Sequence, residues 1–173
     1  MLNFFDSFFK KDNDLEKMNF SLEIGPHTDL ETLPPVKDVY VTMLPGGDYK
    51  DTADKSGNLV KKGFNPVPHF PARSINNEEE LKEYVSRCKD QGVKQALVIG
   101  GSRDPIGKFD SSYQILETGF FDGIKIGMAG HPEGSPDIPE QDLEKAMMDK
   151  KPYADYIVTQ WLLDSQPIID FIS

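Results

Sequence analysis

The sequence predicts an α/β protein of the (β/α)₈ barrel type, in which about six of the eight βα units are present. Short apolar runs alternate with polar, helix-compatible stretches from Phe20 onward, as in parallel sheets built from βα units. Successive runs lie about 25 to 30 residues apart, so eight units need about 250 residues. The chain has 173 residues. We therefore expect a partial barrel over residues 20–173, preceded by an N-terminal extension of residues 1–19.

Each expected strand is short, mostly apolar and followed by a loop of Gly, Pro or polar residues. The candidates are Phe20–Ile24, Val39–Met43, Asn65–Phe70, Gln95–Ile99, Lys125–Ala129 and Asp155–Thr159. Parallel strands in such folds bring their carboxyl ends to one face, where functional residues gather.

The helix expected after Asn77 has the clearest start, because Asn77 is a good N-cap and Glu78–Glu80 give an acidic first turn. Its apolar stripe ends at Gly92. Further helices are expected at Ser112–Thr118 and Pro139–Lys150, around Lys55–Lys62 within a Gly- and Asp-rich stretch that starts at Pro45, and in the final Ser165–Ser173 segment.

Composition excludes several classes of protein. Lys and Arg total 19 against 29 Asp and Glu, and the net charge of -10 disfavours binding to nucleic acid or an anionic membrane. No apolar run approaches the roughly 20 residues that span a bilayer, and early charges argue against a signal sequence. The single cysteine, Cys88, excludes an intramolecular disulfide and favours the cytoplasm. His27, His69 and His131 lack ligand-like spacing, so no metal site is expected.

Both ends of the chain bear on assembly. Leu2, Phe4, Phe5, Phe8 and Phe9 fit a short amphipathic helix that docks on this protein or on a second subunit. The sequence stops within the helix after its sixth strand, as expected of a fragment of a full barrel or of a natural partial barrel. Open sheet edges make us expect a chain that is unstable alone or that forms a homo-oligomer.

Glu23 alternates with Leu22 and Ile24, so its side chain points to the opposite face, which in a closed barrel is the interior. Burial there would raise the pKa of the carboxyl group and suit it to general acid catalysis. The alternative is a solvated glutamate at a strand end.

Two further strand ends carry candidate ligand contacts. His69 lies among Pro66, Pro68 and Pro71, and its stiff surroundings fix the ring for a ligand or for a backbone carbonyl. After the next strand, backbone amides of Gly100-Gly101-Ser102 can approach a phosphate or a flat ring, although two glycines alone are a weak signal.

The loop from Ala129 to Asp137 contains two prolines and two glycines and has a defined shape. It holds a ligand or serves as a stiff connector. The sequence lacks the dinucleotide-binding, P-loop, serine-hydrolase and zinc-protease motifs, which excludes those readings.

Taken in order, the strand ends resemble the methylenetetrahydrofolate reductases. The motifs are Ser-Leu-Glu, Val-Thr, Pro-His, Gly-Gly, Gly-His-Pro-Glu-Gly and Ile-Val-Thr-Gln, at the first to the sixth expected strand. The resemblance runs from about Phe20 to the last residue and implies a (β/α)₈ barrel that binds FAD. In that family NAD(P)H reduces the flavin, which passes hydride to 5,10-methylenetetrahydrofolate and yields 5-methyltetrahydrofolate for one-carbon metabolism and methionine synthesis.

The resemblance also implies roles for single residues. Glu23 matches the acid that protonates the folate so that its five-membered ring opens to an iminium, and Gln160 matches the glutamine that binds the pterin. The positions that match flavin contacts are Thr42, His69, Gly100, Gly101, Ala129 and His131, where the family more often has tyrosine in place of His131.

Departures from the family pattern lie around the flavin. Ser102 stands where the reductases have an aspartate that tunes the flavin, and Ser135 stands where they often have a histidine near the FAD phosphates. Lys150 and Lys151 can be aligned with a phosphate-contacting lysine of the family only by shifting the register. These changes leave two alternatives to a flavin-dependent reductase, namely a folate-binding one-carbon or methyl-transfer protein without flavin, and a non-catalytic fragment.

Overall fold

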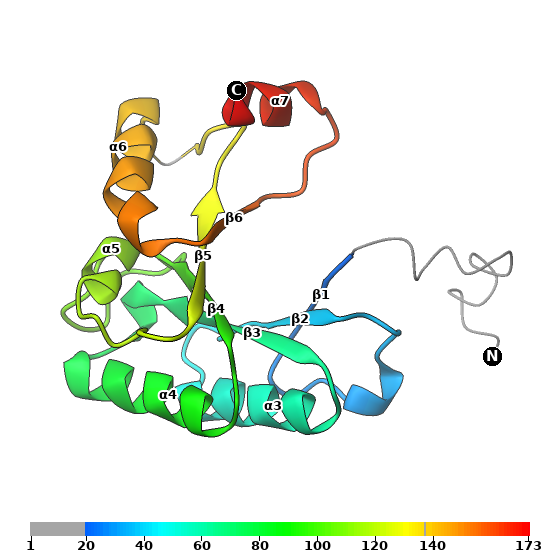
Figure 1. The fold of residues 1–173 in the computed structure, drawn as a ribbon. Helices are drawn as coiled ribbons and strands as arrows, with labels where there is room; N and C mark the ends of the chain where they lie inside the picture. Colours follow the sequence, from blue (N-terminus) through cyan, green and yellow to red (C-terminus); the bar gives the residue numbers. More distant parts are fainter. Residues whose placement is uncertain (1–19, 137) are drawn as a thin grey trace, which may run out of the picture.

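The computed structural model describes residues 20–136 and 138–173, which form one parallel sheet with helices around it (Figure 1). Strands follow in sequence order, β1-β2-β3-β4-β5-β6, and every neighbouring pair is parallel. The direction of the strands turns markedly between β2 and β5, so the sheet curls (Figure 1). The strands are β1 (Leu22–Ile24), β2 (Asp38–Val41), β3 (Asn65–Pro71), β4 (Gln95–Ile99), β5 (Lys125–Gly130) and β6 (Tyr156–Thr159). The predicted parallel α/β arrangement and all six predicted strands are confirmed.

α-Helices follow the strands β2 to β6, as expected for βα units, and a 3₁₀ turn follows β1. They are α3 (Tyr49–Lys61), α4 (Glu78–Asp90), α5 (Ser112–Leu116), α6 (Glu140–Lys150) and α7 (Gln166–Ile172), with single 3₁₀ turns η1 (Leu30–Thr32), η2 (Ala72–Ser74) and η3 (Lys151–Tyr153). The apolar cluster of Leu2, Phe4, Phe5, Phe8 and Phe9 lies outside the described residues.

Helix α4 begins as the sequence predicts, while α3 begins earlier than expected. In α4 the side chain of Asn77 accepts a hydrogen bond from the backbone N–H of Glu80 at 2.9 Å. In α3 the carboxylate of Asp48 caps the N–H of Lys50 at 2.9 Å. The expected start near Lys55 is wrong, because the first turn is held by Tyr49, which is buried with its ring centroid 5.2 Å from that of Tyr84.

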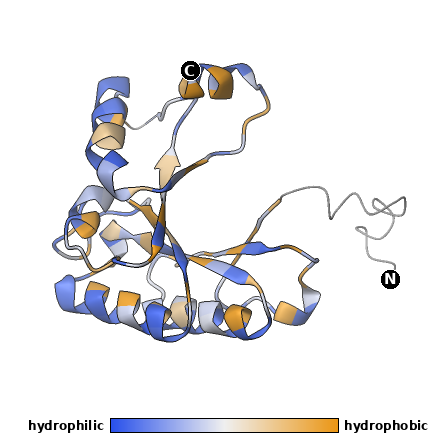
Figure 2. Cartoon of the chain, viewed as in Figure 1, coloured by the Kyte–Doolittle hydropathy of each residue, from blue (hydrophilic) through white to orange (hydrophobic). Residues whose placement is uncertain are grey.

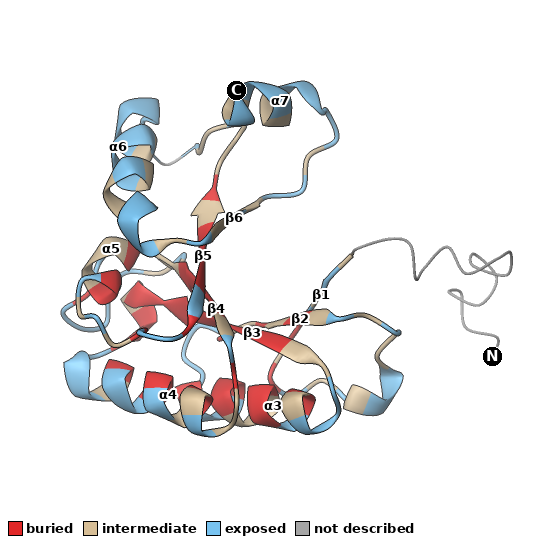
Figure 3. Cartoon of the chain, in the orientation of Figure 1, coloured by how far each residue is buried: buried red, intermediate tan, exposed pale blue. Residues whose placement is uncertain are grey.

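The core lies on the side of the sheet that faces α3 and α4, where buried residues concentrate (Figure 3). Phe70 of β3 stacks on Tyr84 of α4 with ring centroids 4.0 Å apart. Both helices keep hydrophilic residues outward, while hydrophobic positions recur toward the sheet (Figure 2). Residues 39 and 41 of β2, 66, 68 and 70 of β3, and 96 and 98 of β4 share this face with the helices.

Strand β3 tolerates prolines inside the sheet because of how parallel strands alternate their hydrogen bonds. The N–H of Asn65 donates to Lys37 on the β2 side at 2.9 Å, so the positions of Pro66 and Pro68 point their missing N–H groups toward β4. Pairing of β3 with β4 begins only at His69, opposite Leu97. The prolines therefore remove hydrogen bonds between the start of β3 and β4, and leave the pairing of β3 with β2 intact.

Helices α6 and α7 stand apart from the core, and neither contains a buried residue (Figure 3). Several large apolar side chains near β6 and α7 are exposed, with Trp161 at 88%, Leu163 at 97% and Ile172 at 75%. Among the described residues, no helix has both the length and the apolarity to cross a membrane.

Candidate functional site

The concave face of the sheet, opposite α3 and α4, carries a cavity of about 600 Å³ that we call the β1–β6 cavity. The strand register places Glu23 beside Tyr40 and gives both the same face as His69 and Leu97. Glu23 from β1 and Gln160 from the end of β6 both border this cavity. The acid and the amide that we predict to contact the substrate therefore lie at the same cavity. Its wall consists of Ser21, Glu23, Tyr40, Leu97, Val158, Thr159, Gln160, Trp161, Leu162 and Ile168.

Glu23 points to the concave face, as its alternation with Leu22 and Ile24 predicts, but it is not buried. Its side chain is 65% exposed, so the expected buried carboxylate is wrong. The reason is that nothing in the described chain covers the concave face in front of β1, whereas the prediction assumed a closed interior. Desolvation therefore cannot support a general acid role for Glu23, and such a role depends on the groups next to it.

His69 is a titratable neighbour of Glu23. Its Nε2 lies 3.8 Å from Oε2 of Glu23, and its side chain is 7% exposed. The ring stands edge-on to Tyr40 with centroids 6.1 Å apart. Burial lowers the pKa of His69, and the negative charge of Glu23 opposes that shift. His69 borders neither of the two cavities described here, so the structure puts it behind Glu23 rather than in a cavity wall.

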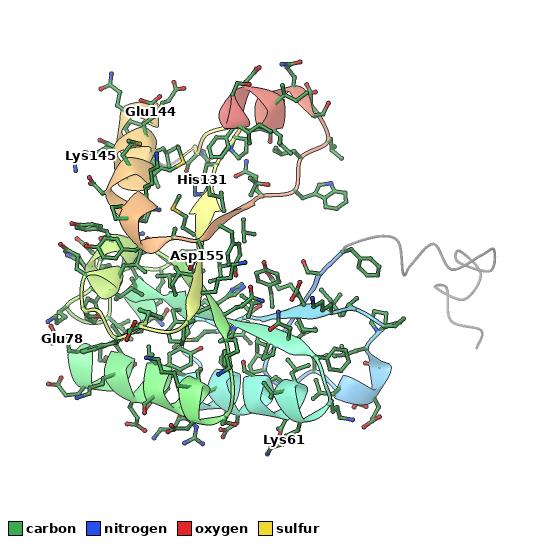
Figure 4. All side chains as sticks on the ribbon, viewed as in Figure 1. Lys61, Glu78, His131, Glu144, Lys145 and Asp155 are labelled. Carbon is green, nitrogen blue, oxygen red and sulfur yellow. The ribbon has the colours of Figure 1, made fainter. Side chains whose placement is uncertain are left out.

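A second cavity, of about 700 Å³, lies at the carboxyl ends of β4 and β5 and is called the β4–β5 cavity. Gly100, Ala129 and His131, three of the residues expected to contact flavin, border it. Figure 4 shows His131 at the tip of β5, between α6 and α7 in that view. The wall also includes Arg73, Ile99, Asp110, Ser111, Gly130, Gly134, Glu140, Leu143, Glu144, Met147, Lys150, Asp170 and Phe171.

A hydrogen bond joins the two cavities. Nδ1 of His131 lies 3.2 Å from Oε1 of Gln160. Because an amide oxygen only accepts, Nδ1 carries the proton in this arrangement, and the Gln160 NH₂ group keeps both of its hydrogens for other acceptors. The bond therefore links a residue of one wall with a residue of the other, although 29 positions separate them in sequence.

The loop after β4 is held against β3 by the backbone of Arg73. The N–H of Arg73 donates to Gly100 O at 3.0 Å. Gly101 has φ +93°, and a Cβ there would lie 3.3 Å from Pro71, so the position requires glycine. The next residue, Ser102, is exposed and borders neither cavity.

The remaining predicted contacts, Thr42 and Ser135, also lie outside both walls. The N–H of Thr42 donates to Ile24 O at 2.9 Å, which ties the end of β2 to β1. Ser135 pairs with Ile138 through an antiparallel bridge in the loop after β5. Both residues therefore lie on loops beside the cavities, without forming part of either wall.

Charges in the β4–β5 cavity are mixed. Arg73 and Lys150 supply positive charge, and burial lowers the pKa of Lys150. Glu140, Glu144 and Asp170 supply negative charge on the same wall. An anion would therefore have to bind close to Arg73 and Lys150, away from the carboxylates of α6 and α7.

Sequence analysis missed most of the apolar and aromatic wall of the β1–β6 cavity. Tyr40 and Leu97 share their sheet face with Glu23, so the same alternation that placed Glu23 could have found them. Trp161 and Ile168 lie beyond the last strand, where no alternation pattern applies. Within the described residues no group of three or more His, Cys, Asp or Glu side chains is placed to hold a metal ion.

Comparisons with known proteins give a weak structural similarity and no family. No family model matches the chain. A solved structure of the YdjI aldolase from Escherichia coli K12 is similar to it at 10% sequence identity and a TM-score of 0.40. The match covers 72% of this chain and 46% of that one, so the chain spans less than half the length of the aldolase. Nothing about aldolase chemistry transfers to this chain at that level of similarity.

Proposed function

We propose that this chain is part of a (β/α)₈-type oxidoreductase that reduces 5,10-methylenetetrahydrofolate to 5-methyltetrahydrofolate with NAD(P)H, using bound FAD. The observation that supports this most is the pairing of cavities. Glu23 and Gln160 border one cavity, Gly100, Ala129 and His131 border the other, and the bond from His131 to Gln160 links them. Two adjoining cavities suit a reaction that transfers hydride between two bound molecules.

The β4–β5 cavity has features that fit a flavin. A Cβ built on Gly100 would meet no atom within 4 Å, so a flat ring can approach this backbone. The cavity volume of about 700 Å³ lies within the usual range for cofactor sites, about 300 to 1,000 Å³. Arg73 and Lys150 are the groups available to the diphosphate.

Within this proposal the flavin, when bound, carries hydride from NAD(P)H to the folate. Glu23 donates a proton to the folate nitrogen that leaves when the five-membered ring opens. Gln160 donates from its NH₂ group to the pterin, because His131 already uses its oxygen. Tyr40, Leu97 and Trp161 supply the apolar and aromatic wall on which a planar ring packs.

One observation favours a folate-binding one-carbon or methyl-transfer protein that lacks flavin. Ser102 replaces an acidic residue in the related motif, and its side chain is exposed and outside the β4–β5 cavity. A chain that had lost flavin would keep the β1–β6 cavity and change this loop. The two proposals differ in a property that can be seen by eye, since bound FAD is yellow.

The deciding experiment is a titration of the purified chain with FAD, followed by the shift of the flavin absorbance. We expect saturable binding, and then reduction of the bound flavin by NADH or NADPH. Glu23→Gln should keep NAD(P)H oxidation with an artificial acceptor and lose folate reduction, because only the second step needs the acid. Glu31→Gln, which removes an exposed carboxylate of η1, is the matched control and should keep both.

Two results would contradict the reductase proposal. Absence of FAD binding together with tetrahydrofolate binding would leave the flavin-free alternative. Equal loss of both activities in Glu23→Gln would remove the assigned acid role.

A further inference from the structure

Two described residues have a buried side-chain polar atom without a hydrogen-bond partner, namely His69 and Tyr156. Nε2 of His69 is buried and accepts or donates no hydrogen bond within the described chain. Oε2 of Glu23, at 3.8 Å, is the nearest charged atom recorded for it. This separation exceeds a hydrogen bond, and a rotation of the exposed Glu23 side chain can close it.

In the described part of the chain, the other contacts of His69 are with a hydroxyl, an aromatic ring and an apolar residue. The hydroxyl of Tyr84, from α4, donates to the backbone oxygen of His69 at 2.9 Å. From β2 the ring faces the edge of Tyr40, and from β4 its register partner is the apolar Leu97. From β1 it faces Glu23. A buried imidazole flanked in this way favours its neutral form, in which Nε2 can accept a proton donor's hydrogen bond.

We propose that His69 and Glu23 form a proton-sharing pair, in which neutral His69 accepts a hydrogen bond from protonated Glu23 and so positions this acid toward the β1–β6 cavity. The bond gives the exposed Glu23 side chain a defined direction, because the backbone of its buried partner His69 is itself held by Tyr84. His69 acts through Glu23 and is a positioning residue.

The catalytic consequence rests on the proposed function. Glu23 gives its proton to the leaving nitrogen of the folate ring, the C–N bond breaks, and its electron pair stays on that nitrogen. An iminium remains on the other nitrogen, and the Glu23 carboxylate takes a replacement proton from water. His69 then again accepts the hydrogen bond from the restored acid, so the imidazole ends the cycle in its starting form.

The pair itself can be tested by NMR titration of the ¹⁵N-labelled chain, without flavin or folate. His69 signals are assigned by their loss in His69→Gln. If His69 shares a proton with Glu23, its ring signals should respond at two pH midpoints, and in Glu23→Gln a single midpoint should remain, because the second titrating group is gone. A His69 titration that is the same in the parent chain and in Glu23→Gln overturns the pair.

The pair of His27 and Asp51 provides a matched control. Nε2 of His27 lies 3.8 Å from Oδ2 of Asp51, the same separation as in the proposed pair, but both side chains are exposed. Asp51→Asn removes a carboxylate of α3 and should leave the His69 titration unchanged. A change in both variants would point to a general change of surface charge and overturn the pair.

The positioning role has its own test. His69→Leu should lower folate reduction at least tenfold, change its pH profile, and affect it more strongly than NAD(P)H oxidation with an artificial acceptor. His69→Gln, which keeps an acceptor, should recover part of the loss. Equal loss of both activities would contradict the positioning role. If the chain binds no FAD, the reductase proposal fails while the NMR titration still decides the pair.

Discussion

Gln160 accepts a hydrogen bond from His131 across 3.2 Å, and each of the two residues borders a different cavity. The contact joins the end of β6 to the loop after β5, so reorienting either side chain breaks it. A change on one side should therefore be detected by ligands on both sides.

Gln160→Leu removes the acceptor of His131 and the donor proposed for the pterin. Loss of one neutral hydrogen bond costs about 1 kcal/mol, which corresponds to a dissociation constant about fivefold larger. We expect weaker binding of both tetrahydrofolate and FAD, measured by calorimetry. Gln141→Leu, at an exposed position of α6, is the control. Weakening of folate binding alone would show that the link has no energetic role.

Gly100→Ala separates flavin binding from folding. A Cβ at Gly100 meets no atom within 4 Å, so the free energy of unfolding should stay within about 0.5 kcal/mol. The added methyl group points into open space at the end of β4, where we place the flat ring, and should weaken FAD binding at least tenfold. Gly25→Ala, whose Cβ would lie 3.9 Å from Thr28, is the control. Unchanged FAD affinity in Gly100→Ala would place the flavin elsewhere.

Tyr84→Phe tests the bond that anchors the backbone of His69. Tyr84 is fully buried, and its hydroxyl donates to His69 O at 2.9 Å. Removing the donor leaves a buried carbonyl unpaired, so we expect a loss of about 1 to 3 kcal/mol in the free energy of urea unfolding. Tyr153→Phe, at an exposed ring, should change it by less than about 0.5 kcal/mol. Similar values for the two variants would contradict the anchoring role.

Cys88 should resist alkylation in the folded chain. Burial raises the pKa of this thiol to about 12, so at pH 8 only about one molecule in 10⁴ carries the reactive thiolate. Labelling with iodoacetamide should therefore follow unfolding, and its rate should rise with urea concentration. Because Cys88 is the single cysteine, the signal is unambiguous. Fast labelling of the native chain at pH 8 would show that α4 opens locally.

Local pattern was enough to predict most of the sheet and one helix. The β-rich runs coincide with all six strands, and Asn77 caps α4 as its position indicates. The start of α3 could not be predicted in the same way. Its first turn is stabilised by Tyr49 packing on Tyr84 of α4, a contact between residues far apart in sequence that local propensity does not contain.

The sequence predicted toward which face of the sheet Glu23 points, but it did not predict how exposed that side chain is. Alternation placed Glu23 on the concave face, and strand order brought it to the same cavity as Gln160. Its exposure depends on what covers that face, which is a property of the whole sheet. The pairing of His69 with Glu23 likewise needed the curl of three strands, since the two residues are neighbours in space only.

Trp161, the sole tryptophan of the chain, is 88% exposed and forms part of the wall of the β1–β6 cavity. An indole in water emits at long wavelength, and a planar molecule stacked on it would shift or quench that emission. Trp161 is thus an intrinsic fluorescent reporter at the β1–β6 cavity, where we place the folate. Binding of unlabelled compounds to this cavity can be measured from the tryptophan fluorescence alone, with no assumption about the reaction.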